Sequence, residues 1–154
     1  MHAGIVLLRI FWGVVYFSNG LAKLYPRIAH PWNGLSLMTN QDAYNIASQD
    51  VSNHPVHLYQ SLITDFILPN WGVFGPFLGI CEMAVGGLLI FGFASRLAAL
   101  LGALLAINLQ FLTLFSEGWV FQYSIIWVSM LCLSLMKAGR YLGLDGATGN
   151  TRMI

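Results

Sequence analysis

Four long apolar stretches constrain the fold of this chain more than any other feature. They run from about Ala3 to Leu24, from Trp71 to Ala94, from Leu97 to Phe115 and from Trp119 to Met136. Each approaches the length of about 20 residues that a helix needs to cross a bilayer. A membrane β-barrel would show short alternating segments instead, and these stretches are continuous. We therefore predict an all-α integral membrane four-helix bundle, formed as a single domain over residues 1–154.

The amino-acid composition points to the same class. Hydrophobic residues make up 57 % of the chain and charged residues 8 %, with a formal net charge of +1. Soluble domains have roughly a quarter of their residues charged, so this charge set does not suit a water-exposed surface. A nucleic-acid-binding protein would carry a basic patch, and a disordered chain would be far less apolar. The expected surroundings are therefore a lipid bilayer, with no nucleic-acid partner.

The connections between the stretches predict how the helices are arranged. Very short turns separate the last three, which makes them antiparallel neighbours. Residues 25–70 form a long loop between the first two helices. Counting Lys and Arg near the span ends favours cytoplasmic termini and an extracytoplasmic loop. The residues expected on the cytoplasmic side are Arg9, Arg96, Lys137, Arg140 and Arg152, against Lys23 and Arg27 outside.

The second half of this loop has a helical pattern. Asn53 is a candidate N-cap, and Pro55 stands where a first-turn proline is tolerated. Apolar residues then recur at helical spacing up to Ile67, and Pro69 is expected to end the helix just before the second span. Such a helix would lie on the membrane surface or cover the bundle.

Glu82 is the charged residue that the bilayer should reject most strongly. It lies about midway along the second span, with Gly79 and Gly86 on the same helical face. These small residues would let another helix approach closely. A carboxylate at this depth must be protonated, paired or in a wet cavity, and intramembrane charges usually mark functional sites. Glu82 is therefore the candidate catalytic residue.

Polar residues on neighbouring spans provide partners for Glu82. Arg9, Tyr16 and Lys23 follow one stripe of the first span, and Asn19 lies close to it. We expect these groups, with Asn108 and Gln110 of the third span, to surround a polar pocket that opens outward beneath the loop. Two other interpretations stay open. Arg9 and Lys23 could simply snorkel to the membrane surfaces, and the amides could form interhelical hydrogen bonds without a ligand.

No motif indicates a metal, haem or flavin site. His54 and His57 are three residues apart, but no recognised spacing joins them to further ligands, so we expect no metal. The role of these two residues and of His30 stays open. Cys81 and Cys132 lie in different spans without a C-x-x-C motif, and we expect them to pack as small apolar residues.

Several short segments resemble the DoxX/DoxD membrane protein family. Leu8-Arg9-Ile10 and Ser18-Asn19-Gly20-Leu21-Ala22-Lys23-Leu24 are similar to its first helix. Asn53-His54-Pro55 with Tyr59 resembles the loop of the DoxD branch. Glu82 with Gly92-Phe93-Ala94-Ser95-Arg96-Leu97-Ala98 resembles an "E…G-x-x-[ST]-R-x-A" stretch, and Gly139-Arg140-Tyr141 with Asp145 resembles a "G-R-[YW]-x-x-x-D" tail.

This resemblance implies a membrane subunit of a quinone-linked sulfur oxidoreductase in a bacterial or archaeal cytoplasmic membrane. The DoxD branch is the small subunit of thiosulfate:quinone oxidoreductase, which couples two thiosulfates to tetrathionate and reduces a quinone. Its partner is a DoxA-like subunit or another redox protein, which would have to carry the electrons. Glu82 would act as the proton relay. The expected substrate-binding residues are Arg9, Tyr16, Asn19, Lys23, Arg96, Asn108 and Gln110.

Three alternatives remain beside this interpretation. Arg96 could be a positively charged anchor at a tight turn rather than a binding residue. The protein could be a non-catalytic DoxX-like membrane protein that docks or supports a redox partner. It could also be a pathway for protons or a small molecule centred on Glu82.

Overall fold

The computed structural model describes residues 2–29, 36–52, 54–116, 121–136 and 138–147, and every regular element in these ranges is helical. Three helices are long and apolar enough to cross a membrane, and a fourth apolar helix is shorter. The predicted all-α membrane bundle is therefore confirmed. The main helices are α1 (His2–Leu24), α4 (Trp71–Phe91), α5 (Ser95–Thr113) and α6 (Ser124–Leu135).

Large apolar side chains cover the outer faces of these helices. Leu7 and Phe11 of α1, Val73 of α4 and Leu104 of α5 are each more than half exposed. In water such a surface would be unfavourable, whereas in hydrocarbon it is the expected one. The helices are therefore surrounded by lipid.

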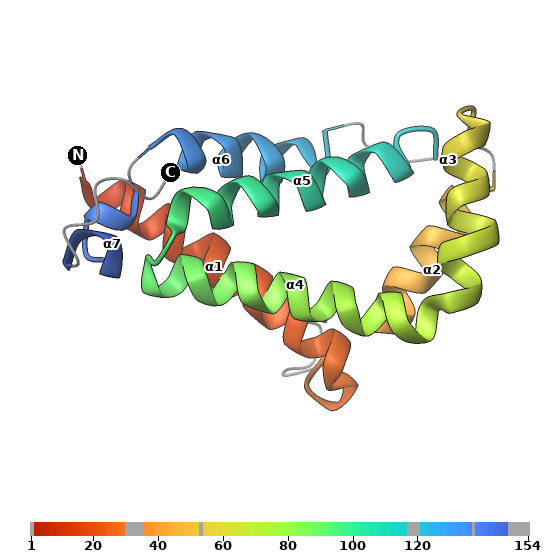
Figure 1. Ribbon diagram of the computed structural model, residues 1–154, viewed down its shortest axis with the longest axis horizontal. Coiled ribbons are helices and arrows are strands. Elements are labelled where there is room, and N and C mark those ends of the chain that lie inside the picture. Colours follow the sequence, from red (N-terminus) through yellow and green to blue (C-terminus); the bar gives the residue numbers. More distant parts are fainter. Residues whose placement is uncertain (1, 30–35, 53, 117–120, 137, 148–154) are drawn as a thin grey trace.

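The helices form two pairs that diverge from one end. α1 packs closely along α4, and α5 packs along α6, while α4 and α5 have far fewer contacts with each other. Figure 1 shows that α4 and α5 are joined by a tight turn at one end and separate toward the other, where α2 and α3 lie. Both the N-terminal end of α1 and the last described residues lie at the narrow end, near this turn.

The turn between α4 and α5 depends on left-handed backbone conformations. Gly92 has φ +64° and Ala94 has φ +45°, so α4 ends at Phe91 and α5 begins at Ser95. The predicted spans place the same break a few residues later, because apolar residues continue through the turn. Glycine adopts a positive φ without steric cost, which explains why the helix ends here.

Glycine residues allow α1 and α4 to touch along their backbones. A Cβ atom at Gly86 would lie 2.6 Å from the carbonyl oxygen of Gly13, and one at Gly20 would lie 2.6 Å from the carbonyl oxygen of Gly79. No larger side chain fits at these crossings. The predicted close approach of a helix to Gly79 and Gly86 is confirmed, and α1 is the helix that approaches.

The loop between α1 and α4 contains more helix than the apolar pattern predicts. After a short 3-10 turn, η1 (Pro26–Ile28), the chain forms α2 (Asn40–Asp50). A capping box fixes the start of α2, because the Thr39 side chain accepts from the backbone of Asp42, whose carboxylate accepts from the backbone of Thr39. α2 is mostly polar, which is why a search for apolar periodicity misses it.

The prediction that Pro69 ends the loop helix is wrong. The chain runs helically from His57 to Phe91, through α3 (His57–Ser61), the π-helical turn η2 (Leu62–Ile67) and the 3-10 turn η3 (Leu68–Asn70) into α4. Pro69 falls in the first turn of η3, where a missing N–H is tolerated. The run bends sharply where α4 begins (Figure 1), and the candidate cap Asn53 lies outside the described residues.

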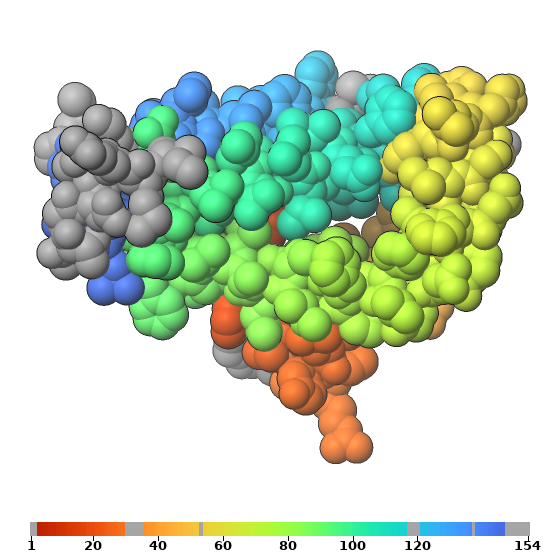
Figure 2. Space-filling view, viewed as in Figure 1, coloured from red at the N-terminus to blue at the C-terminus, as the bar shows by residue number. Residues whose placement is uncertain are grey.

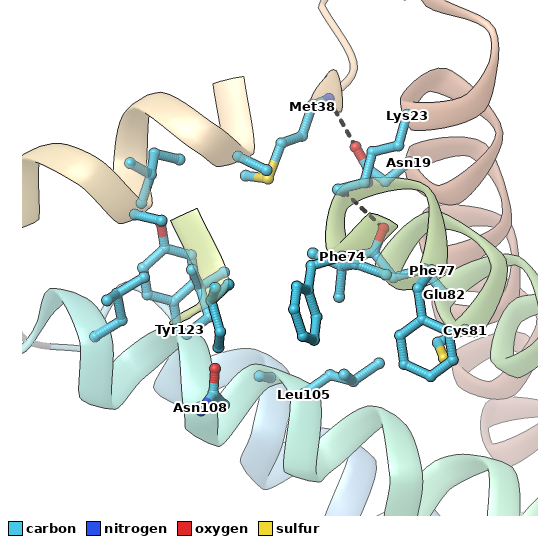
Figure 3. Close-up of a pocket in the computed structure, with 18 of the residues that line it drawn as sticks. Asn19, Lys23, Met38, Phe74, Phe77, Cys81, Glu82, Leu105, Asn108 and Tyr123 are labelled. Carbon is cyan, nitrogen blue, oxygen red and sulfur yellow. Dashed lines mark hydrogen bonds and ion pairs between the residues drawn. The ribbon is translucent and has the colours of Figure 1, made fainter. Parts of the chain in front are cut away.

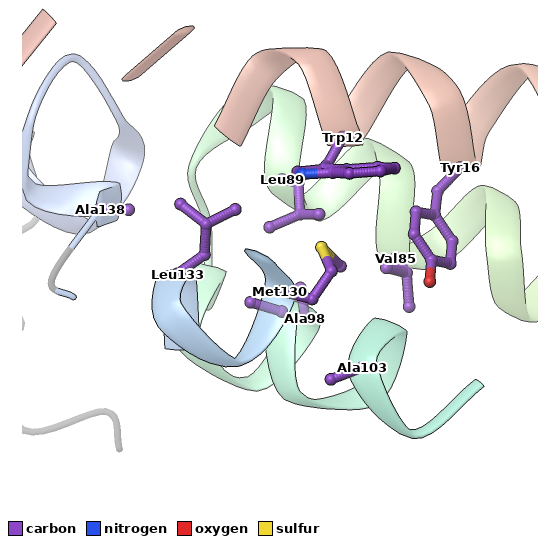
Figure 4. Close-up of a cluster of buried hydrophobic side chains, with 10 residues drawn as sticks. Trp12, Tyr16, Val85, Leu89, Ala98, Ala103, Met130, Leu133 and Ala138 are labelled. Carbon is purple, nitrogen blue, oxygen red and sulfur yellow. The ribbon is translucent and has the colours of Figure 1, made fainter. Parts of the chain in front are cut away.

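Two apolar clusters hold these elements together. The larger one fills the narrow end of the bundle, where Trp12 and Tyr16 of α1 meet Val85 and Leu89 of α4 and Met130 of α6 (Figure 4). The smaller one lies at the wide end and joins Ala47 and Val51 to Ile63 and Leu112. The loop helices are thus packed onto α5 and cover the bundle there.

Candidate binding cavity

A cavity of about 320 Å³ lies between the two helix pairs, at the level where they diverge. Aromatic and aliphatic side chains form most of its wall, and a few polar groups of α1, α4 and α5 complete it (Figure 3). α2 and η2 contribute Ala43, Ala47 and Ile63 at the loop end. A pocket therefore lies beneath the loop, but the prediction of a polar pocket is wrong, because most of the wall is apolar.

Lys23 and Glu82 form an ion pair in the wall of this cavity. The Lys23 Nζ donates to Glu82 Oε2 at 2.7 Å, and the two side chains are 1 % and 15 % exposed. The stem of Lys23 packs against Gly79, so the close helix crossing brings the ammonium to the carboxylate. The prediction that α1 supplies a partner for Glu82 is confirmed, and Lys23 does not snorkel.

Tyr16 and Asn19 of α1 also line the cavity, but both have structural partners. The Tyr16 hydroxyl donates to the carbonyl oxygen of Gly102 at 2.6 Å and so links α1 to α5. Asn19 Oδ1 accepts from the backbone N–H of Met38, while its Nδ2 donates to the carbonyl oxygen of Val15. These side chains therefore position the cavity wall, and a ligand would meet groups that are already held in place.

The opposite wall comes from α5 and carries a polar group at its surface. Asn108 lines the cavity and is itself exposed, and Leu105 and Leu109 flank it. Phe74 and Phe77 of α4 lie across the cavity from this wall (Figure 3). The arrangement combines aromatic side chains, the amides of Asn19 and Asn108, and one buried ion pair.

Three of the residues predicted to bind substrate lie outside the cavity, namely Gln110, Arg96 and Arg9. Gln110 Oε1 accepts from the Ser124 hydroxyl at 3.1 Å, which ties α5 to α6. Arg96 donates from Nε to the carbonyl oxygen of Ser134 at 3.0 Å. Both side chains thus link neighbouring helices, and their polarity alone does not reveal which face of α5 they occupy.

Arg9 lies at the narrow end and is completely buried. Its guanidinium donates to the carbonyl oxygens of Ala138, Tyr141 and Leu142 at 3.1, 3.4 and 2.9 Å. Snorkelling is therefore the wrong interpretation for this residue. Arg9 instead holds the C-terminal segment, which contains the 3-10 turn η4 (Ala138–Arg140) and the short helix α7 (Leu144–Ala147), against α1.

Asp145 is a structurally important residue that the site prediction did not include. Its carboxylate accepts from the backbone N–H groups of Ala94 and Ser95 at 2.8 and 3.1 Å and from the Ser95 hydroxyl at 2.8 Å. These contacts satisfy N–H groups at the start of α5. Asp145 belongs to the tail motif noted above, so the sequence contained a signal for it without giving its role.

The two loop histidines have different surroundings. His54 is 2 % exposed, and its ring packs against Tyr59, Phe111 and Phe115. Its Nδ1 accepts from the backbone N–H of Val56, which leaves Nε2 to donate to the carbonyl oxygen of Phe111. His57 is exposed, and His30 lies outside the described residues. Within those residues no three His, Cys, Asp or Glu side chains gather as metal ligands.

Comparison with known protein families identifies the chain. A family model described as DoxX matches residues 4–114, which is more than two thirds of the sequence. The chain belongs to the DoxX family. The matched range contains α1, α4, α5 and the loop helices, and thus most of the cavity wall of this DoxX protein. Comparisons with curated proteins and with solved structures gave no match.

Proposed function

We propose that this DoxX protein is the membrane subunit of a quinone-linked oxidoreductase and that its cavity holds the quinone ring. The observation that carries this proposal is a cavity with aromatic walls and a buried Lys23–Glu82 ion pair in one of them. Sites for small molecules are typically apolar clefts with a few fixed polar groups.

The size and lining of the cavity suit a single aromatic-like ring. Its volume of about 320 Å³ falls at the lower end of ligand pockets, which run from about 300 to 1,000 Å³. A quinone ring is flat, uncharged and carries two opposed carbonyl oxygens. Phe74 and Phe77 offer it a stacking surface, and Asn108 and Lys23 offer hydrogen-bond donors.

The ion pair supplies one of the protons that quinone reduction needs. Reduction to quinol takes up two electrons and two protons, one proton at each oxygen. Lys23 can hold a ring oxygen as negative charge develops on it and can transfer one proton to that oxygen. Glu82 is deprotonated in the pair, so the second proton and the proton that recharges Lys23 are taken up from water, with Glu82 as the group that accepts and relays them. The electrons would come from a redox partner, such as the DoxA-like subunit that the DoxD resemblance implies.

The same geometry favours the quinone over thiosulfate as the occupant of the cavity. Thiosulfate is a dianion and needs an excess of positive charge, but the carboxylate of Glu82 already neutralises Lys23. We therefore assign thiosulfate oxidation, the reaction of the DoxD branch, to the partner's side of the complex and quinone reduction to this subunit.

Quinone binding to the protein in lipid nanodiscs tests the proposal. We expect a ubiquinone analogue to bind and to be reduced when thiosulfate and the partner protein are added. The variant Ala106→Phe fills the cavity from α5 and should weaken binding at least tenfold. Ile107→Phe, on the exposed side of the same helix, is the matched control and should bind as the unmodified protein does.

Two results would overturn the proposal. Absence of quinone binding, with the partner still bound, would instead indicate a non-catalytic docking protein. Equal weakening by Ala106→Phe and Ile107→Phe would show that the quinone binds elsewhere.

A further inference from the structure

The cavity has an opening between α4 and α5. In the space-filling view the two helices separate toward the wide end, and a gap between their side chains exposes atoms of elements behind them (Figure 2). The cavity lies between the same two helices. The cavity wall is therefore interrupted on this side of the bundle.

Residues at this opening belong to both the cavity and the outer surface. Phe77 of α4 lines the cavity and is 61 % exposed, and Asn108 of α5 lines it and is exposed. Leu105 of α5 is half-buried in the same wall, and its neighbour Leu104 is 52 % exposed. The cavity surface thus continues onto the outside of the bundle.

The opening lies at membrane depth. Phe77 comes six residues after the start of α4 and Leu105 ten residues after the start of α5. At a rise of 1.5 Å per residue these positions are roughly 9 and 15 Å from the respective helix starts. Both are inside helices long enough to span a bilayer. A hydrocarbon core about 30 Å thick would therefore surround the opening.

The loop end of the cavity is covered. Ala47 and Val51 of the α2 segment pack with Ile63 of η2 and Leu112 of α5, and all four are buried. Among the described residues, the side opening is thus a more direct route to the cavity than the loop end. Lys23 and Glu82 lie on α1 and α4, and Leu105 and Asn108 on α5 form the facing wall.

We propose that ligands enter this cavity sideways from the bilayer, between Phe77 and Leu105, and that the natural ligand is a lipid with a polar head and an apolar tail. The head reaches the Lys23–Glu82 pair, and the tail extends between α4 and α5 into the hydrocarbon. For a quinone head this inference rests on the proposed function and specifies a long-tailed quinone. The side opening itself does not depend on the identity of the head group.

The two cysteines allow a test of the opening without any quinone. Cys81 lines the cavity, and Cys132 is exposed on α6. A nitroxide label is attached to Cys81 in Cys132→Ser and to Cys132 in Cys81→Ser, both in phosphatidylcholine vesicles. Molecular oxygen dissolves in lipid and a neutral nickel chelate stays in water. The reagent that relaxes the nitroxide more strongly therefore shows whether the label is in contact with lipid or with water. We expect oxygen to relax both labels more strongly than the nickel chelate does.

Two outcomes of this measurement would overturn the side opening. Stronger relaxation of the Cys81 label by the nickel chelate would mean that the cavity opens to water. Relaxation by neither reagent would mean that it is closed. Leu105→Trp should lower the oxygen effect at Cys81 severalfold, and Leu100→Trp, an exposed position on the same helix, should leave it unchanged.

A second measurement tests the tail and separates the two proposals. A tailed quinone should bind at least tenfold more tightly per molecule in the bilayer than the same ring without a tail. Leu105→Trp should remove this difference, while Leu100→Trp should retain it. Equal affinity of both quinones would overturn the tail assignment but leave quinone binding intact. If neither quinone binds, the proposed function fails, and the oxygen measurement at Cys81 still decides the opening.

Discussion

The ammonium of Lys23 lies 2.7 Å from the carboxylate of Glu82, and both side chains are removed from water inside a membrane bundle. Each charge alone would be costly at this depth, so the pair is stable because both members are present. The glycines at the α1–α4 crossing bring the two side chains together.

Removing one member of this pair should be worse than removing both. Glu82→Gln leaves the Lys23 ammonium buried without a counter-charge, and we expect a loss of about 3–5 kcal/mol of unfolding free energy. Lys23→Met with Glu82→Gln should recover most of that loss. Unfolding of the single and double variants in mixed micelles measures the coupling. Additive losses would show that the two charges do not stabilise each other.

A methyl group at Gly86 should push α1 and α4 apart. A Cβ there would overlap the backbone of Phe17 and Gly13, which no side-chain movement can relieve. We expect Gly86→Ala to cost about 1–3 kcal/mol and to lengthen the Lys23–Glu82 contact. Gly87→Ala is the control, because nothing lies within 4 Å of its added Cβ. Similar melting temperatures for the two variants would contradict the close crossing.

Lysine should not replace Arg9. The planar guanidinium donates to three carbonyl oxygens of the C-terminal segment. The lysine side chain is shorter and its ammonium is a compact group, so it cannot reach the same three acceptors. Arg9→Lys should therefore speed hydrogen exchange in residues 138–147. Arg96→Lys, which affects the hydrogen bond to the carbonyl oxygen of Ser134, is the control and should leave that segment protected. If hydrogen exchange in residues 138–147 is the same in Arg9→Lys as in the unmodified protein, Arg9 does not hold the C-terminal segment in place.

The carboxylate of Asp145 should stabilise the start of α5 from the far end of the sequence. Asp145→Ala removes three hydrogen bonds to Ala94 and Ser95, and a lost helix cap typically costs about 1 kcal/mol. Ser95→Ala removes one of the three and should have a smaller effect. Thermal unfolding of both variants gives the order, and a larger loss for Ser95→Ala would contradict the capping role.

The membrane bundle and the ion pair could be predicted because they follow from local patterns. Continuous apolar stretches indicate the spans, and a carboxylate among glycines indicates both a close helix contact and the need for a partner. Lys23 followed from its place on the α1 stripe. These inferences use spacing along one helix, which the sequence displays directly.

Other features depend on contacts between distant segments and could not be predicted this way. α2 is short and polar, so apolar periodicity does not reveal it. What holds it in place is a contact with α4, where Asn40 accepts from the Trp71 indole and packs against Gly75. The role of Arg9 depends on a segment about 130 residues later folding back onto it. Gln110 is a predicted site residue because of its polarity and Arg96 because of the DoxX/DoxD resemblance, but the rotation of α5 turns both toward α6.

The tight turn at residues 92–94 has a mechanical consequence for the cavity. This turn connects the α1–α4 pair to the α5–α6 pair, and we infer that it is the pivot about which the two pairs tilt. Leu105 lies ten residues along α5 from the pivot, roughly 15 Å away, so a tilt of about 5° displaces it by roughly 1 Å. Asp145 binds the start of α5, and Arg9 of α1 binds the same C-terminal segment, so this segment ties the two helix pairs together near the pivot. We expect it thereby to limit the width of the proposed opening at the opposite end of the molecule.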